Sequence, residues 1–169
     1  MQLGATQEKL KAVGVETVAV VNTPLERARL YFKYRPARVL LAADPDATTH
    51  RAFGLSAVEV VEDPATTKWP LRITMAELSQ VAVNPTGELP KPTPVFEAME
   101  ILNTRDGFEP TEADQQIAAA HGTQGVGHFL IDRQGIVRWT QIEAGEGPAD
   151  LVRFPADAEI LEAARTMLR

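Results

Sequence analysis

The residues best suited to metal binding are two carboxylates and an imidazole, Asp44, Asp46 and His50, which lie within seven positions of the chain. Carboxylate oxygens and imidazole nitrogens together can ligate zinc and similar cations. Aspartate is also a common helix cap, and Pro45 between the two carboxylates favours a turn. We therefore predict a turn, a helix cap and a solvent-facing histidine here, and no metal site.

A second group joins two histidines to a glycine-rich loop. His121 and His128 flank the stretch 122–127, which reads Gly-Thr-Gln-Gly-Val-Gly. A phosphate-binding loop would carry a lysine and would lead from a strand into a helix, whereas this loop precedes a strand. We interpret it as a tight connection. Because the chain offers no nucleophile for His128 to activate, we expect this histidine to stabilise the structure rather than to catalyse.

Two short acidic runs could supply the paired carboxylates of glycoside hydrolysis; they lie at 59–63 and 109–114. Runs of this kind usually form solvated faces or helix starts, and nothing in their spacing fixes a separation between two carboxylates. Ser56 and Ser79 lack the context of a nucleophile elbow. Trp69 and Trp139 are expected to cover a core edge rather than to stack on a ligand. The residues thus predict no catalytic group, no metal site and no cofactor.

The composition of the chain further restricts its fold class, its chemistry and its partners. The chain has 169 residues, 44% of them hydrophobic and 24% charged, as expected for one globular domain spanning 1–169. The absence of cysteine excludes disulfides, thiolate nucleophiles and cysteine-based metal sites. A net charge of −6 argues against nucleic acid as a partner. No apolar run approaches the roughly 20 residues of a membrane span, and Met1–Gly4 do not resemble a signal peptide, so a cytoplasmic location is the default expectation.

Helical and strand patterns alternate in the first third of the chain. We predict a helix from Leu3 to Val13, a central and doubly covered strand from Val15 to Asn22, and a helix capped by Thr23 and Glu26 that ends near Tyr34. A strand over 39–42 and a short helix ending at Gly54 follow. This alternation predicts an α/β fold with a parallel sheet.

The alternation of helix and strand patterns does not continue between residues 55 and 122. We expect a strand or hairpin arm at 58–61 and a helix from Ile73 to Val83. An extended proline-rich strip at 89–94, a helix that packs through Val95, Met99 and Leu102, and a helix from Glu112 to His121 should follow. The apolar residues are too few for a separate core. We therefore interpret about 57–122 as a helical insertion folded onto a single domain.

The last part of the chain predicts a β-hairpin and a closing helix. The apolar run Phe129–Ile131 reads as a strand, Asp132–Gly135 as a tight turn, and Ile136–Trp139 as the returning strand. The helix that begins near Pro155 should pack through an apolar face made of Ile160, Leu161, Ala164, Met167 and Leu168.

These pieces resemble one family. The hairpin sequence Phe-Leu-Ile-Asp-x-x-Gly-Ile-Val-Arg at 129–138, the strand at 15–22 and the stretch 40–55 are similar to the peroxiredoxin-like or redoxin (alkyl hydroperoxide reductase/thiol-specific antioxidant) family of the thioredoxin-like superfamily. The resemblance covers about 1–56 and 123–169. It implies a thioredoxin-like sheet flanked by helices, thiol-dependent reduction of peroxides or disulfides, and a homodimer or a redox partner protein.

The resemblance also shows what this chain lacks. In the family the reactive cysteine begins the helix that corresponds to Leu3–Val13, where the helix dipole lowers the thiol pKa. The preceding strand and the cysteine turn are missing here, so we expect the natural gene product to be longer at its N-terminus. The family's cis-proline or arginine would fall at Gly125, Val126, Gly127 or His128. These four residues, beside the family's active-site face, are the candidate binding face.

Three hypotheses for function follow. The chain belongs to a thiol oxidoreductase family but lacks its catalytic segment and is inactive as written. Alternatively, it is a true cysteine-free member that acts as a non-catalytic binding or scaffolding module. The third hypothesis is an unrelated hydrolytic or metal-dependent enzyme on the same architecture.

Overall fold

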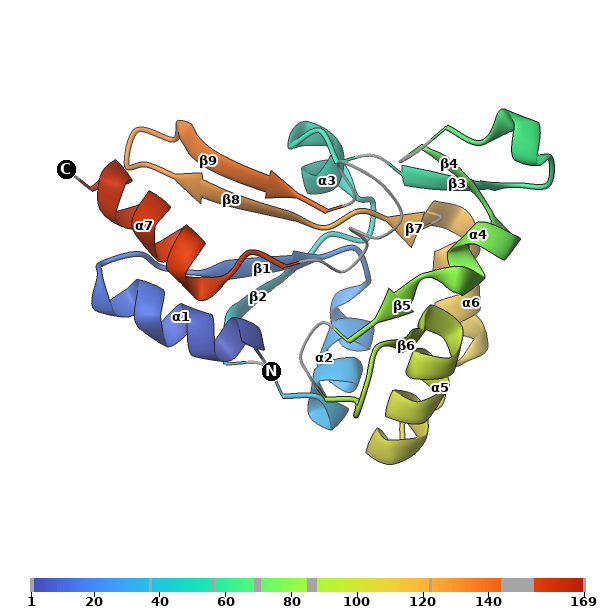
Figure 1. The fold of residues 1–169 in the computed structure, drawn as a ribbon. Helices are drawn as coiled ribbons and strands as arrows, with labels where there is room; N and C mark the ends of the chain where they lie inside the picture. Colours follow the sequence, from blue (N-terminus) through green and yellow to red (C-terminus); the bar gives the residue numbers. More distant parts are fainter. Residues whose placement is uncertain are drawn as a thin grey trace.

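A computed structural model of the chain describes residues 2–36, 38–55, 57–68, 71–84, 88–121, 123–143 and 154–168. Helices alternate with short strands along most of this length (Figure 1). In chain order the elements are α1 (Gln2–Ala12), β1 (Val18–Val21), α2 (Leu25–Tyr34), β2 (Leu40–Ala43), α3 (Thr48–Ala52), β3 (Ala57–Val61), the 3-10 helix η1 (Pro64–Thr66), β4 (Arg72–Thr74), α4 (Met75–Gln80), β5 (Ala82–Val83), β6 (Thr93–Pro94), α5 (Val95–Asp106), α6 (Glu112–His121), β7 (Thr123–Gln124), β8 (Gly127–Ile131), β9 (Val137–Ile142) and α7 (Asp157–Met167).

The strands of the described residues form four small sheets. β1 pairs with β2 in parallel, and β8 pairs with β9 antiparallel. β3 lies between β4, which is parallel to it, and β7, which is antiparallel. β5 and β6 form a short antiparallel pair. The fold is therefore α/β, as predicted, but the described strands do not join into one continuous hydrogen-bonded sheet.

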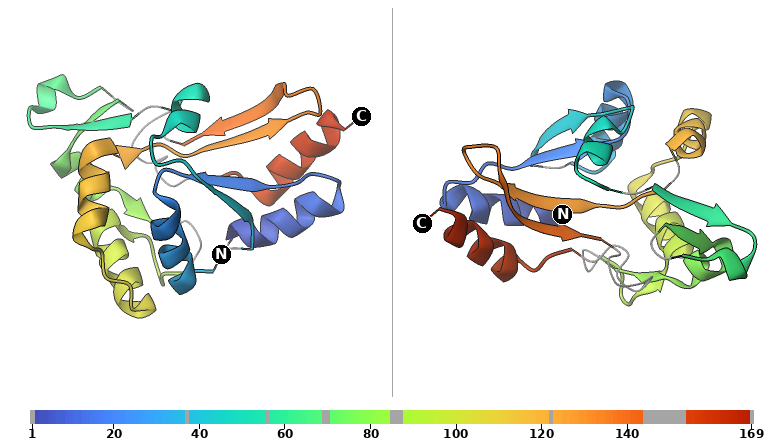
Figure 2. Two further views of the ribbon diagram at one scale, coloured as in Figure 1. Left: turned by 180° about the vertical axis from the view of Figure 1, so that it is seen from behind. Right: turned by 90° about the horizontal axis from the view of Figure 1, so that it is seen from above.

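The elements gather into two parts (Figures 1 and 2). One part holds α1, β1, β2, α7 and the β8–β9 hairpin, and the other holds the elements from β3 to α6. The core of the first part consists of Leu10, Leu130, Ile160 and Ala164. Trp139 packs against these residues. α1 and α7 therefore meet each other over one face of the hairpin.

The second part has a small core of its own, made of Val81, Val83, Leu89 and Ala98. Val95 and Leu102 pack against this cluster, whereas Met99 is 53% exposed. The expectation that this segment has no core of its own, and that Met99 helps it to pack, is thus wrong. The strand expected at 58–61 is present as β3, and the segment also contributes the unexpected short strands β4, β5 and β6, so it is less helical than predicted.

Helix α2 joins the two parts. The ring of Phe108, just after α5, packs edge-on against Tyr31 at 5.3 Å and Tyr34 at 5.8 Å. Arg35 at the end of α2 donates to Asp106 at 2.6 Å. Arg27 of the same helix forms a two-pronged ion pair with Asp114 of α6. Aromatic contacts and charge-assisted hydrogen bonds therefore hold the segment 57–122 against the first part.

The N-terminal capping of α2 and α4 differs from the prediction. α2 begins after Pro24, with no side-chain cap, and Glu26 pairs with Arg29 instead of closing a capping box. A capping box forms instead at α4, where Thr74 and Glu77 bond each other's backbone amides. The residues expected to form one helix from Ile73 to Val83 therefore divide into β4, α4 and β5.

Strand β1 departs from its predicted central position. It pairs only with β2 among the described strands, and Val18 is 53% exposed. The predicted hairpin, by contrast, is confirmed. Asp132 accepts hydrogen bonds from the amides of Gln134 and Ile136, both at 2.9 Å, and Gly135 adopts φ +80°. The turn is thus closed by a carboxylate and a left-handed glycine.

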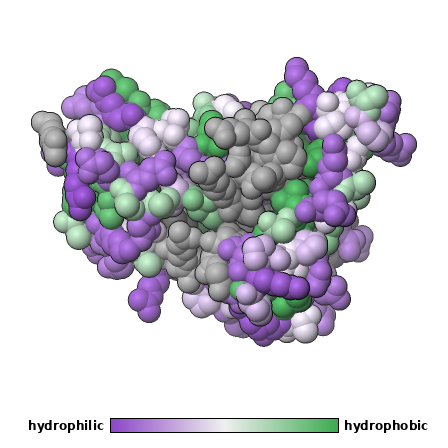
Figure 3. Space-filling view, in the orientation of Figure 1, coloured by the Kyte–Doolittle hydropathy of each residue, from purple (hydrophilic) through white to green (hydrophobic). Residues whose placement is uncertain are grey.

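The closing helix packs largely as predicted. Ile160 and Ala164 of α7 are buried, but Leu168 is 46% exposed. Asp157 at the helix start binds Thr6 and Lys9 of α1, and so fixes the two helices side by side. On the face shown in Figure 3, hydrophobic and hydrophilic residues of the described part of the chain are interspersed. None of the described helices is long and apolar enough to cross a bilayer.

Candidate functional site

The candidate binding face, Gly125 to His128, lies where the chain leaves β7 and enters β8. Gly127 and His128 are the first residues of β8 and stand opposite Ile142 and Gln141 of β9. This end of the hairpin lies away from the tight turn at Asp132 (Figure 1). Val126 is 39% exposed, and the other three residues are partly covered.

Gly127 occupies a position that leaves no room for a side chain. A Cβ atom there would lie 2.6 Å from the ring of Phe129 and 2.7 Å from a methyl group of Leu55. The Phe129 ring packs in turn on Phe53 at 4.7 Å between centroids. The glycine is therefore explained by close packing between the hairpin and the segment that follows α3.

His128 is held by a polar and an aromatic neighbour. Its Nδ1 lies 2.9 Å from Oε1 of Gln141, and its ring meets Phe154 edge-on at 5.5 Å. Burial lowers the pKa of His128 below its ordinary value, although the hydrogen bond to Gln141 opposes this shift. With Oε1 of Gln141 assigned as the acceptor, Nδ1 carries the proton. The neutral imidazole then has a lone pair on Nε2, which can accept a hydrogen bond.

A buried carboxyl group closes the same end of the hairpin. Glu143 is 6% exposed; its amide donates to the carbonyl oxygen of Val126 at 2.8 Å, and its carboxylate accepts from the amide of Val126 at 2.9 Å. Burial raises the pKa of Glu143. Neither Gln141 nor Glu143 was predicted from the sequence. Alternation along β9 would have found them, because Trp139, Gln141 and Glu143 share one face of the strand.

The cluster at 44–50 forms the predicted turn; Ala47 occupies the N-cap position of α3 without a side-chain cap, and Asp44 instead bonds an amide in the first turn of the helix. Asp44 accepts a hydrogen bond from the amide of Thr49 at 2.6 Å, and this bond is the main reason that the pKa of Asp44 is lowered. The backbone oxygen of Asp46 accepts from Arg51. His50 differs from expectation, because its Nδ1 is buried without a hydrogen-bond partner rather than facing solvent. Within the part of the chain that the structure describes, no group of three acidic or histidine residues is placed to hold a metal ion.

The acidic runs serve structural roles. Glu59 of β3 forms an ion pair with Arg72 of β4 at 2.8 Å. Asp63 caps η1 by accepting from the amide of Ala65, and Asp114 pairs with Arg27. These carboxylates bond to cations and amides of their own surroundings, which fits the interpretation as solvated faces and helix starts. The side chain of His121, and Ser56, Trp69 and Gly122, lie outside the described residues.

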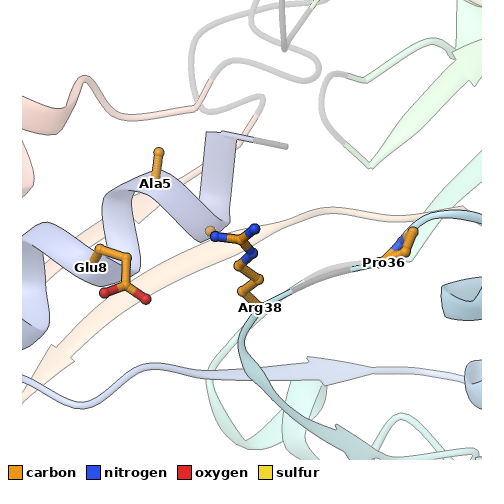
Figure 4. A pocket seen from close by; sticks show the side chains of 5 residues that line it. Ala5, Glu8, Pro36 and Arg38 are labelled. Atoms are coloured by element: carbon orange, nitrogen blue, oxygen red, sulfur yellow. The ribbon is translucent and has the colours of Figure 1, made fainter.

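A pocket of about 450 Å³ lies away from this face, between the first turns of α1 and the chain after α2. Gly4, Ala5, Glu8, Pro36 and Arg38 line it. Figure 4 shows the Arg38 guanidinium directed toward α1, with the Glu8 carboxylate on the same helix. The opposite charges of Arg38 and Glu8 beside three small apolar residues do not define a reaction.

Comparison of the chain with protein-family models, with characterised proteins and with solved structures finds no match. The geometry of the Gly125–His128 face is therefore the main guide to function. It combines an exposed valine, a neutral imidazole and a buried carboxyl group at the open end of a hairpin. Such a surface can donate and accept hydrogen bonds, and the chain has no cysteine with which to attack a substrate.

Proposed function

We propose that this chain is a redoxin-related member of the thioredoxin-like superfamily that acts as a non-catalytic binding module for another protein. The Gly125–His128 face is its binding face. The observation that carries the proposal is His128, a neutral imidazole held through Nδ1 by Gln141 at 2.9 Å, in a chain without cysteine. An imidazole fixed in this way is suited to recognition, because Nε2 offers a hydrogen-bond acceptor of fixed direction.

The arrangement of elements supports the redoxin relationship. A helix, a strand, a helix and a second parallel strand precede the insertion, and a hairpin and a closing helix follow it. α1 and α7 pack together against the hairpin through Leu10, Leu130 and Ile160. This order of elements supports the relationship that the resemblance at 129–138 implies, whereas the described strands do not form the continuous sheet that it also implies. A protein partner, rather than nucleic acid, agrees with the net charge of −6.

The second candidate is thiol-dependent reduction of peroxides or disulfides, which the sequence likeness at 129–138 favours. That reaction needs a thiolate nucleophile. The 169 residues contain none, and the lowered pKa of His128 keeps its imidazole uncharged at neutral pH, where it would do little to stabilise a thiolate. Recognition is therefore the function that these residues support best.

Two measurements test the proposal. With hydrogen peroxide, thioredoxin and its reductase, the purified chain should consume no more peroxide than a protein-free control; turnover would contradict a non-catalytic role. A benzophenone amino acid placed at Val126 should crosslink one protein in an extract of the source cells. The same probe at Ile136, which is 49% exposed at the other end of the hairpin, should not.

Replacement of His128 with phenylalanine keeps an aromatic ring against Phe154 but removes the acceptor. The crosslink from Val126 should then be lost. An identical pattern of crosslinks from Val126 and Ile136, or a crosslink that His128→Phe leaves unchanged, would contradict the assignment of this face.

A further inference from the structure

The pocket between α1 and the chain after α2 is a second candidate binding site, separate from the Gly125–His128 face. Its volume of about 450 Å³ is in the range of cavities that hold small organic ligands. The wall consists of Gly4, Ala5 and Glu8 on α1, with Pro36 and Arg38 on the other side. Apart from two charged side chains, the pocket is therefore lined by small or apolar residues.

Backbone contact holds the two sides of the pocket together. A Cβ atom at Gly4 would lie 3.7 Å from Cβ and 3.9 Å from the backbone nitrogen of Arg38, so the chain after α2 runs close to the first turns of α1. Pro36 has a restricted φ and no N–H group, and it forms a stiff apolar part of the wall. The position of Arg38 beside Gly4 is thus set by the backbone and not by a side-chain partner.

The two charged side chains of the pocket have no partner within the described part of the chain. Arg35, three positions before Arg38, bonds to Asp106 at 2.6 Å. No such hydrogen bond or ion pair engages Arg38 or Glu8, and these two residues do not bond to each other. A guanidinium that can donate several hydrogen bonds and a carboxylate that can accept them therefore line one pocket without protein partners.

The spacing of these groups suits a ligand that carries both charges. Arg38 lies against Gly4, and Glu8 is one turn further along α1, about 6 Å along the helix axis. Figure 4 shows the guanidinium directed toward α1 and the carboxylate on that helix. The gap prevents a direct ion pair, but two charge-assisted hydrogen bonds with a small molecule between them would span it.

We propose that this pocket binds a free α-amino acid with an apolar side chain. The carboxylate of the ligand accepts a pair of hydrogen bonds from Arg38, and its ammonium group donates to the Glu8 carboxylate. The side chain of the ligand lies against Ala5 and Pro36. The inference goes beyond the proposed protein-binding function, because it assigns a small-molecule ligand to a different surface.

The two charges favour such a zwitterion over other occupants. A simple anion would leave Glu8 without a partner. An extended segment of polypeptide, from this chain or another, has no charge on its backbone and would leave both side chains unpaired. Because Arg38 and Glu8 are exposed to solvent, each contact strengthens binding only modestly, and we expect a dissociation constant in the millimolar range.

Titration of the full chain with L-leucine, followed by NMR, tests the proposal. Leucine should shift the amide signals of Gly4, Ala5, Glu8 and Arg38. N-acetyl-leucine lacks the ammonium group and leucine amide lacks the carboxylate, so each should bind about fivefold more weakly than leucine.

Variants of the two charged residues assign each contact. Arg38→Gln and Glu8→Gln should each weaken leucine binding about fivefold. Glu8→Gln should not weaken the binding of N-acetyl-leucine further, because the group that Glu8 would contact is already absent. The matched controls are Arg133→Gln and Glu16→Gln, which change the charge equally at exposed positions in the hairpin turn and before β1; they should leave leucine binding unchanged.

Three results would overturn the proposal. The first is that leucine leaves the four pocket amides unshifted, and the second is an equal loss of binding in the control variants. The third is that N-acetyl-leucine N-methylamide, which has the uncharged groups of a polypeptide backbone, binds as well as leucine; an extended chain would then be the occupant. The crosslink from Val126 does not depend on leucine, so failure of the pocket and failure of the protein-binding face can be told apart.

Discussion

Replacement of Gly127 with alanine should destabilise the protein. The added Cβ would lie 2.6 Å and 2.9 Å from ring atoms of Phe129 and 2.7 Å from a methyl group of Leu55. Favourable contacts between carbon atoms begin near 3.5 Å, so both side chains must move. The Phe129 ring is itself packed on Phe53, which limits the direction in which it can turn.

The expected change follows from two opposing effects. Overpacking of this kind costs about 1–3 kcal/mol, whereas alanine in a strand gains roughly 0.5–1 kcal/mol over glycine because the unfolded chain is less flexible. Because both neighbouring side chains must move, the cost of overpacking should lie in the upper half of its range, and the free energy of unfolding should fall by about 1–2.5 kcal/mol. For a chain of this size that corresponds to a decrease in Tm of about 2–10 °C.

Urea and thermal denaturation followed by circular dichroism would measure this change. Gly4→Ala is the matched control, since its Cβ would meet nothing closer than Arg38 Cβ at 3.7 Å, and in α1 it should raise stability by about 0.5 kcal/mol. Combining Gly127→Ala with Leu55→Ala should cost less than the sum of the single changes, because the shortened side chain relieves one contact. A Gly127→Ala variant as stable as the unmodified protein would refute the packing explanation of this glycine.

Three further predictions concern charge and core packing. Hydrogen bonds from Arg105 and then Arg35 lower the pKa of Asp106 to about 2. The contribution of this carboxylate to stability is therefore present above its ordinary pKa and is lost as the pH falls toward 2. Asp106→Asn should lower the urea midpoint at pH 7 and should reduce the loss of stability at acid pH. Burial raises the pKa of Glu143, so its contribution to stability is complete below the ordinary pKa of glutamate and is lost as the pH rises through the raised pKa. Glu143→Gln should therefore stabilise the protein more at pH 8 than at pH 4. Equal effects at both pH values would contradict its burial as a charged group. Leu130→Ala in the first core should lower the free energy of unfolding by about 2–4 kcal/mol and Met99→Ala on the exposed side of α5 by less than about 0.5 kcal/mol, as measured by urea denaturation; similar losses would contradict their different burial.

Features fixed by neighbouring residues could be predicted from the sequence. The hairpin is the clearest case, because Asp132 and Gly135 supply the turn chemistry and the apolar runs on either side have the strand period. The turn at Asp44 and the helix from Glu112 to His121 are also local features. In each case the residues that decide the structure lie within a few positions of each other.

Features set by distant contacts could not be predicted in this way. Whether Ile73 to Val83 forms one helix depends on pairing between β3 and β4 and on the Thr74–Glu77 cap, which end the helix pattern on its N-terminal side. The exposure of Met99 depends on where the small core of the second part lies. Helical periodicity places a residue on a face but does not say which face is buried.

The candidate site was located only in part. The Gly125–His128 stretch was singled out through its glycines and its histidine, but its partners Gln141 and Glu143 come from the opposite strand. The open edge that β1 has among the described strands differs from the central position that its run of β-branched residues predicts. Pairing between strands far apart in sequence decides both features.

Photo-crosslinking from Val126 in the full chain tests the central claim, a protein-binding face at Gly125–His128, most directly. A benzophenone amino acid at Val126, which is 39% exposed, should crosslink one protein in an extract of the source cells. The same probe at Ile136 should not, and His128→Phe should abolish the crosslink from Val126. Identical crosslinks from Val126 and Ile136, or a crosslink that persists in His128→Phe, would contradict the account.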